Sequence, residues 1–172
     1  TVPARLGECS AFISHSWSDD GVAKYAALHE WAEEAKIASP CIWLDKACID
    51  QTNIDASLAA LPVFVSGCDR LLIVAGETYS TRLWCAMEIF TFVKMGGSRE
   101  RITLKQISAD AIDALSHFDA SRAQCFHSKD RHKLLAVIEV GFGNLTPFNK
   151  VVRGLLTSDQ GAETSKGSLV TV

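Results

Sequence analysis

The chain has 172 residues, of which 48% are hydrophobic and 22% are charged, with a net charge of −3 and a pI near 5.9. This composition is typical of one globular domain and lacks the basic character of a nucleic-acid-binding protein. No apolar run approaches the roughly 20 residues that a membrane-spanning helix needs. We therefore expect no membrane segment in this chain. The first residues show neither a starting Met nor a signal-peptide pattern, so we expect the chain to be a domain of a longer protein.

The cysteines indicate the compartment. Six cysteines would allow three disulfides by number alone, but most of them lie in or beside apolar segments, where a free cysteine behaves as a small hydrophobe. The sequence has no Cys-x-x-Cys pair and no matching histidine spacing, so it does not predict a zinc site. We therefore predict reduced thiols in a cytoplasmic protein, without a metal or a bound cofactor.

The chain begins with a strand, a helix and a second strand. Residues 10–14 form a short apolar run that predicts the first strand. Ser18 and the two aspartates after it signal a helix start, and apolar residues at spacings of three and four predict about five helical turns as far as Ala35. Residues 41–44 predict a second short strand.

A loop, a broken helix and a buried strand are predicted next. Residues 46–53 have no clear period and predict a loop. Helical spacing from Ile54 to Val65 follows, and Pro62 should kink or break that helix. Residues 70–75 form the clearest buried strand of the sequence.

The segment 79–94 then predicts a long helix that Ser80 or Thr81 caps and that Gly96-Gly97 ends. Alternation of strands and helices indicates parallel strands with right-handed crossovers.

The pattern is weaker in the last third. A strand at 101–107, a short helix at 109–115, an edge strand at 123–126 and a helix at 130–140 are predicted. From residue 157 onward, serine, threonine, glycine and charged residues predict a disordered tail. The expected domain spans residues 9–150.

The helix at 79–94 carries an unusual carboxylate. Most of its apolar residues fill one broad arc, Glu88 falls at the border of that arc, and Trp84 lies one turn earlier on the same side. Spacing leaves two interpretations open. Glu88 could reach water or pair with Arg82 as an ordinary boundary residue, or it could be functional.

Three segments should converge where ligands bind in open parallel sheets, outside the carboxyl ends of the strands. They are residues 15–17, 45–51 and 76–84, and each contains polar groups. Structural roles are also open here. Ser16 and Ser18 could only cap a helix, Asp45 could only cap a turn, and Trp17 and Trp43 could be core aromatics.

The stretch with Ser80, Trp84, Cys85 and Glu88 resembles the Trp-Cys-x-x-Glu segment of the Toll/interleukin receptor (TIR) domain family. Residues 11–16 resemble the first strand box of that family, with His15 in place of the usual aromatic residue. Residues 42–45 resemble its second strand. The loop from Lys46 lacks the glycine or proline usual near its tip, so the chain resembles a divergent TIR-like branch.

The resemblance implies a flavodoxin-like three-layer α/β fold with a five-stranded parallel sheet of order 2-1-3-4-5. It also implies cleavage of the nicotinamide–ribose bond of NAD+, with Glu88 as the catalytic residue and NAD+ as substrate. The expected substrate-binding residues are Ser14, His15, Ser16, Trp17, Trp43, Asp45, Lys46, Ser80 and Trp84.

Two alternatives remain at this point. Many TIR domains are scaffolds that assemble with themselves or with other TIR domains and perform no chemistry. A Cys–His hydrolase that uses Cys85 or Cys48 is a weaker alternative, because no histidine lies at a helical partner spacing to Cys85.

Overall fold

The computed structural model describes residues 5, 7–49, 59–126 and 128–155. Its helices and strands are, in chain order, β1 (Cys9–His15), α1 (Gly21–Glu34), β2 (Ile42–Trp43), α2 (Asp45–Cys48), α4 (Leu61–Ser66), β3 (Cys68–Ala75), the 3-10 turn η1 (Tyr79–Thr81), α5 (Leu83–Lys94), the 3-10 turn η2 (Arg99–Arg101), β4 (Ile102–Gln106), α6 (Ala111–Ser116), α7 (Ser128–Phe142) and α8 (Leu145–Gly154).

The described strands form one parallel sheet of order β2-β1-β3-β4. The predicted α/β class and parallel pairing are confirmed, but the expected fifth strand at 123–126 is wrong within the described residues. Gln124 makes only an isolated bridge with Arg82. Its backbone bonds to the turn before α5, at 2.7 Å to the Thr81 carbonyl and 2.9 Å from the Leu83 amide, so this segment extends no sheet edge.

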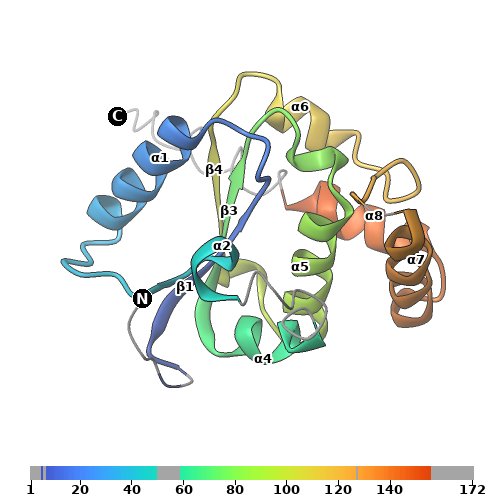
Figure 1. The fold of residues 1–172 in the computed structure, drawn as a ribbon, viewed down its shortest axis with the longest axis horizontal. Coiled ribbons are helices and arrows are strands. Elements are labelled where there is room, and N and C mark those ends of the chain that lie inside the picture. The colour runs from blue at the N-terminus through green and yellow to red at the C-terminus, as the bar shows by residue number, and fades with distance from the viewer. Residues whose placement is uncertain (1–4, 6, 50–58, 127, 156–172) are drawn as a thin grey trace, which may run out of the picture.

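Helices cover both faces of the sheet (Figure 1). Alternate residues of a strand point to opposite faces. Ala11 and Ile13 pack with Trp31 of α1 on one face, and Phe12 packs on the other face with the cluster that includes α4 and α5. Nine of the twelve residues of α5 are buried, because α7 and α8 pack on the side of α5 away from the sheet.

Two predicted helices begin differently from the expectation. The first begins at Gly21 and has 14 residues, about four turns, and Asp20 instead of Ser18 caps it by accepting the Ala23 amide at 2.7 Å. The helix predicted at 79–94 is divided. The turn η1 ends at Thr81, and Arg82 is extended before α5 begins, with no side-chain cap.

Other segments also differ from the prediction. The loop expected from residue 46 begins with the helical turn α2, and its residues 50–53 lie outside the described part. Pro62 does not kink α4. It lies in the first turn, where its missing N–H is tolerated. Residues 54–58 and the tail from 157 also lie outside the described residues, and α8, capped by Asn144, was not predicted.

All six cysteines carry free thiols. In the part of the chain described here, no helix is long and apolar enough to cross a membrane. Within the same residues, no group of histidine, cysteine and carboxylate side chains could hold a metal ion.

Candidate functional site

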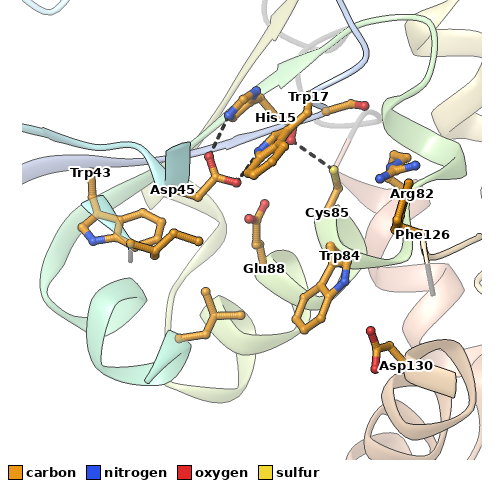
Figure 2. Close-up of a pocket in the computed structure, with 13 residues that line it drawn as sticks. His15, Trp17, Trp43, Asp45, Arg82, Trp84, Cys85, Glu88, Phe126 and Asp130 are labelled. Carbon is orange, nitrogen blue, oxygen red and sulfur yellow. Dashed lines mark hydrogen bonds and ion pairs between the residues drawn. The ribbon is translucent and has the colours of Figure 1, made fainter. Parts of the chain in front are cut away.

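A cavity of about 470 Å³ opens at the carboxyl ends of β1 and β2 (Figure 2). This volume is within the range of small-molecule sites. Three indole rings, two basic side chains and three carboxylates are among its walls. The lining residues are His15, Ser16, Trp17, Trp43, Asp45, Ile49, Leu61, Arg82, Trp84, Cys85, Glu88, Phe126 and Asp130.

Glu88 contributes a buried carboxyl group to this cavity. The residue is only 8% exposed, and its carboxyl group points toward Asp45 and Trp17 (Figure 2). The Ser14 hydroxyl donates a hydrogen bond of 2.5 Å to Glu88 Oε2, and the Tyr79 hydroxyl lies 2.7 Å from Ser14 Oγ. Glu88 is therefore held by the strand β1, and the pairing with Arg82 that the sequence left open is not observed.

Burial raises the pKa of Glu88 well above its usual value. The hydrogen bond from Ser14 opposes this shift, and the nearby charge of Asp45 adds to it. The direction follows from the loss of water around the ionised form. Glu88 therefore keeps its proton at a higher pH than an exposed glutamate does, and a cationic ligand in the cavity would favour its ionised form.

Asp45 is the second carboxylate of the cavity, and it is surrounded by donors. Its Oδ1 accepts from His15 Nε2 at 3.0 Å and from the Lys46 amide at 2.6 Å. Its Oδ2 accepts from the indole N–H of Trp17 at 2.5 Å. Partial burial acts to raise the pKa of Asp45, but the hydrogen bonds and charge of His15 and the bond from Trp17 hold it below its usual value. The same cavity therefore holds one carboxyl group with a raised pKa, Glu88, and one with a lowered pKa, Asp45.

Aromatic rings form the rest of the wall. Trp43 stacks on Phe12 with centroids 4.4 Å apart and on Phe64 at 5.0 Å, so it belongs both to the core and to the cavity. Trp17 is 45% exposed although its N–H is bonded. Trp84 is partly buried and lies on the same helix as Glu88. The cavity therefore offers several flat apolar faces beside a carboxyl group.

Two turns that border the site are tied together. Ser16 Oγ lies 2.7 Å from Thr78 Oγ1, and Asp19 Oδ1 accepts from the amide and the hydroxyl of Thr78 at 2.9 and 2.7 Å. Gly76 permits this contact, because a Cβ there would lie 2.4 Å from Asp19 Cγ. This Asp19–Thr78 clamp fixes the segment after β1 against the segment after β3.

Seven of the ten residues expected in the site line the cavity, and three do not. Ser14 is fully buried behind Glu88. Lys46 is exposed and lies with its Nζ 6.0 Å from the centroid of the Trp17 ring. Ser80 is partly buried in η1 and does not line the cavity.

The fold also brings to the cavity residues that were not predicted to lie there. Arg82 was considered only as a partner of Glu88. Phe126 and Asp130 come from the weakly patterned last third, where no local signal indicated a site. Tyr79 was read only as the first residue of a helix, whereas its buried hydroxyl reaches Ser14.

The structure gives little support to a thiol nucleophile. Cys85 lines the cavity, but burial raises its pKa well above the usual value, and the thiolate is the nucleophilic form. Its Sγ donates to the backbone carbonyl of His15 at 3.4 Å and contacts no imidazole nitrogen. Cys48 is exposed and does not line the cavity.

No family model matches the chain, and no curated protein is significantly similar to it. The arrangement itself can bind a small molecule with a flat ring, and it places a carboxyl group where a positive charge on that molecule would be stabilised.

Proposed function

We propose that this chain is an NAD+ glycohydrolase that cleaves the nicotinamide–ribose bond, with Glu88 as the catalytic residue. One observation supports the proposal most. The buried carboxyl group of Glu88 opens into a cavity lined by the indole rings of Trp17, Trp43 and Trp84. Aromatic faces and a carboxylate together favour a flat cationic ring. The nicotinamide of NAD+ is such a ring.

The chemistry needs only one carboxylate. Departure of neutral nicotinamide leaves an oxocarbenium-like ribose, as in other glycosidic cleavages. An ionised Glu88 would hold the ribose and stabilise this cation, and the effect is larger in a site from which water is excluded. No acid is required, because the leaving group already carries its positive charge in NAD+. Attack by water gives ADP-ribose, and attack by a group of the same molecule gives a cyclic product.

The raised pKa of Glu88 is compatible with this role. Burial penalises the charged form in the empty cavity. A bound nicotinamide ring brings a positive charge close to the carboxyl group, and an opposite charge within a few ångströms lowers a carboxyl pKa. Substrate binding and ionisation of Glu88 therefore favour each other.

The resemblance to TIR domains supports the same reaction and suggests where it acts. The sheet order β2-β1-β3-β4 is compatible with a flavodoxin-like fold. TIR-type NAD+ nucleosidases act in signalling and in cell-death or innate-immunity pathways. We propose such a pathway in the cytoplasm for this chain.

Release of nicotinamide from NAD+ by the purified protein tests the proposal. Glu88→Gln keeps the shape of the side chain and removes its charge, so turnover should fall by about 10²–10³, the usual effect of losing one preorganised electrostatic contact. Glu77→Gln is the matched control, because Glu77 is exposed and lies outside the cavity. Glu88→Gln protein that cleaves NAD+ at the parent rate would remove Glu88 from the mechanism.

A second candidate is a non-catalytic module that assembles with itself or with other TIR domains. One observation favours it. Val22 and Tyr25 lie about one turn apart on α1 and are 80% and 64% exposed. Nicotinamide release that is absent even at high protein concentration, together with self-association that Val22→Ser and Tyr25→Ser abolish, would support this candidate over the enzyme.

A further inference from the structure

We propose that Arg82 forms an anion subsite of the same cavity and binds the diphosphate of a dinucleotide substrate. This inference rests on the proposed function and deepens it. It assigns a binding role to Arg82, which has no part in the proposed bond cleavage, and it gives the substrate one direction in the cavity.

The first support is the surroundings of the Arg82 guanidinium. Arg82 is partly buried and lines the cavity. In the described part of the chain, no acceptor is within hydrogen-bond or ion-pair distance of its side chain. Most other arginines of that part bond to protein oxygens, namely Arg70, Arg99, Arg101, Arg131 and Arg153. A guanidinium in a cavity without an acceptor favours an anionic ligand, and its planar fork matches phosphate oxygens.

The second support is the backbone at this position, which is fixed from two sides. The Arg82 amide donates to the Tyr79 carbonyl at 3.1 Å. The Leu83 amide donates to the Gln124 carbonyl at 2.9 Å, and the Gln124 amide donates to the Thr81 carbonyl at 2.7 Å. The extended conformation of Arg82 between η1 and α5 is thus held by neighbours on both sides. A fixed backbone reduces the entropy lost when the side chain binds a ligand.

The third support is the spacing between Arg82 and Glu88. Arg82 directly precedes α5, and Glu88 lies in the second turn of that helix, five residues or about 8 Å of axial rise after Leu83. Figure 2 shows Glu88 between Asp45 and Trp43 on one side and Arg82 and Phe126 on the other. The diphosphate of NAD+ is attached to the same ribose whose bond to nicotinamide breaks. With that ribose at Glu88, the nicotinamide lies toward Asp45 and the diphosphate toward Arg82.

Asp130 is the one carboxylate at this end of the cavity among the described residues. It lies on α7 and forms no ion pair with Arg82 within 4 Å. The negative charge of Asp130 opposes anion binding and limits the affinity, but Asp130 does not bind the Arg82 guanidinium. Binding at Arg82 should therefore be moderate and sensitive to salt.

Equilibrium binding of ADP-ribose tests the subsite without any chemistry. We would measure its Kd by calorimetry on Glu88→Gln protein and on the same protein with Arg82→Met. Loss of a charge-assisted contact should weaken binding by about 10-fold or more. Arg82→Lys, which keeps the charge but loses the fork, should give an intermediate Kd. Arg122→Met is the matched control, because Arg122 is exposed and lies outside the cavity. Melting temperatures show whether each variant is folded, and Arg82→Lys decides the question if Arg82→Met unfolds.

Nicotinamide riboside has no phosphate, so its cleavage shows whether an Arg82 variant has lost only phosphate binding or has lost activity in general. If the parent cleaves both compounds, Arg82→Met should raise the KM for NAD+ and leave the KM for the riboside unchanged. Equal affinity of ADP-ribose for both Glu88→Gln proteins would overturn the subsite, and so would equal damage with riboside and NAD+. ADP-ribose that fails to bind at millimolar concentration would also overturn it. ADP-ribose binding that depends on Arg82 in a protein without turnover would support the subsite and contradict only the proposed reaction.

Discussion

Ser14 and Glu88 are joined by a hydrogen bond of 2.5 Å that links the carboxyl end of β1 to the middle of α5. The single hydroxyl proton of Ser14 is used in this bond, so the Tyr79 hydroxyl, 2.7 Å away, donates to Ser14 in turn. Both donors are thus directed toward the carboxyl group, which favours its ionised form. Burial acts in the opposite direction. The balance between these two effects sets the pH at which Glu88 carries a charge.

The first prediction is that Ser14→Ala shifts the pH profile of NAD+ cleavage. Turnover requires the ionised form, so it should rise with pH through the raised pKa of Glu88. Removal of the Ser14 donor raises that pKa further and should move the rising limb to higher pH. Tyr79→Phe keeps the bond from Ser14 to Glu88 and should shift the limb less. Nicotinamide release measured from pH 5 to 9 checks this, and identical limbs for Ser14→Ala and the parent would contradict it.

The second prediction concerns stability and pH. The raised pKa means that folded Glu88 binds its proton more tightly than the unfolded chain does, so the free energy of unfolding decreases as pH rises from the ordinary glutamate value through the raised one. Glu88→Gln cannot titrate. Its melting temperature should equal that of the parent in acid and exceed it above neutral pH. Glu77→Gln is the matched control, because Glu77 is exposed and lies outside the cavity. A difference between Glu88→Gln and the parent that is constant across pH would contradict the linkage.

Local patterns explain why much of the fold could be predicted. β1 and β3 are continuous apolar runs, and α5 has apolar residues at helical spacing. The positions of all three agree with the prediction within a few residues. A local pattern could not show that the expected fifth strand is absent from the sheet. Residues 123–126 have strand-like composition, but their hydrogen bonds go to the turn before α5. A tertiary contact of this kind cannot be predicted from the local sequence pattern.

The candidate site could be predicted only where its residues follow strand ends. His15 ends β1 and Asp45 follows β2, so the parallel topology alone brings them together. Prediction of Ser14 as the partner of Glu88 also requires the face of β1 on which Ser14 lies. Phe12 and Ser14 share a strand face, and Phe12 faces the α5 side of the sheet, so Ser14 also faces α5. Asp130 meets the cavity through the packing of α7 on α5, which sequence spacing does not report.

The third prediction concerns the contact between Asp45 and Trp17. Among the described residues, the carboxylate accepts from three donors with its two oxygens, and Asp45→Asn retains only one oxygen. At least one donor therefore loses its acceptor, at about 1 kcal/mol per lost bond. We expect the indole N–H signal of Trp17, assigned with Trp17→Phe, to move and to exchange faster with water. Nicotinamide affinity should fall severalfold.

Stability provides a separate check on Asp45. The pKa of Asp45 is lowered in the folded state. Its contribution to the free energy of unfolding is therefore present above the ordinary aspartate pKa and is lost as the pH falls through the lowered pKa. The melting temperature of Asp45→Asn should therefore approach that of the parent in acid. An unchanged Trp17 signal in both Asp45→Asn and Asp45→Ala would show that the carboxylate does not hold the ring, because alanine retains no acceptor.

The fourth prediction concerns Gly76 and the Asp19–Thr78 clamp. A Cβ at residue 76 would lie 2.4 Å from both Cγ and Oδ2 of Asp19, which is far inside van der Waals contact. Gly76→Ala should displace Asp19 and weaken its bonds to Thr78. Overpacking of this kind destabilises a protein by about 1–3 kcal/mol. Gly21→Ala is the matched control, because a Cβ at residue 21 meets nothing within 4 Å, and its stability should be unchanged or slightly higher.

A double-mutant cycle separates the clash from a backbone effect of alanine. If the cost of Gly76→Ala arises from contact with Asp19, it should be smaller when Asp19 is already alanine. The two nearest atoms, Cγ and Oδ2, are then gone, and only the Asp19 Cβ remains, at 2.8 Å. Two residues in contact are expected to couple by about 0.5–3 kcal/mol. Free energies of unfolding in urea for the four proteins of the cycle measure this coupling. Equal costs of Gly76→Ala in the two backgrounds would mean that the glycine serves the backbone of the turn and not the contact with Asp19.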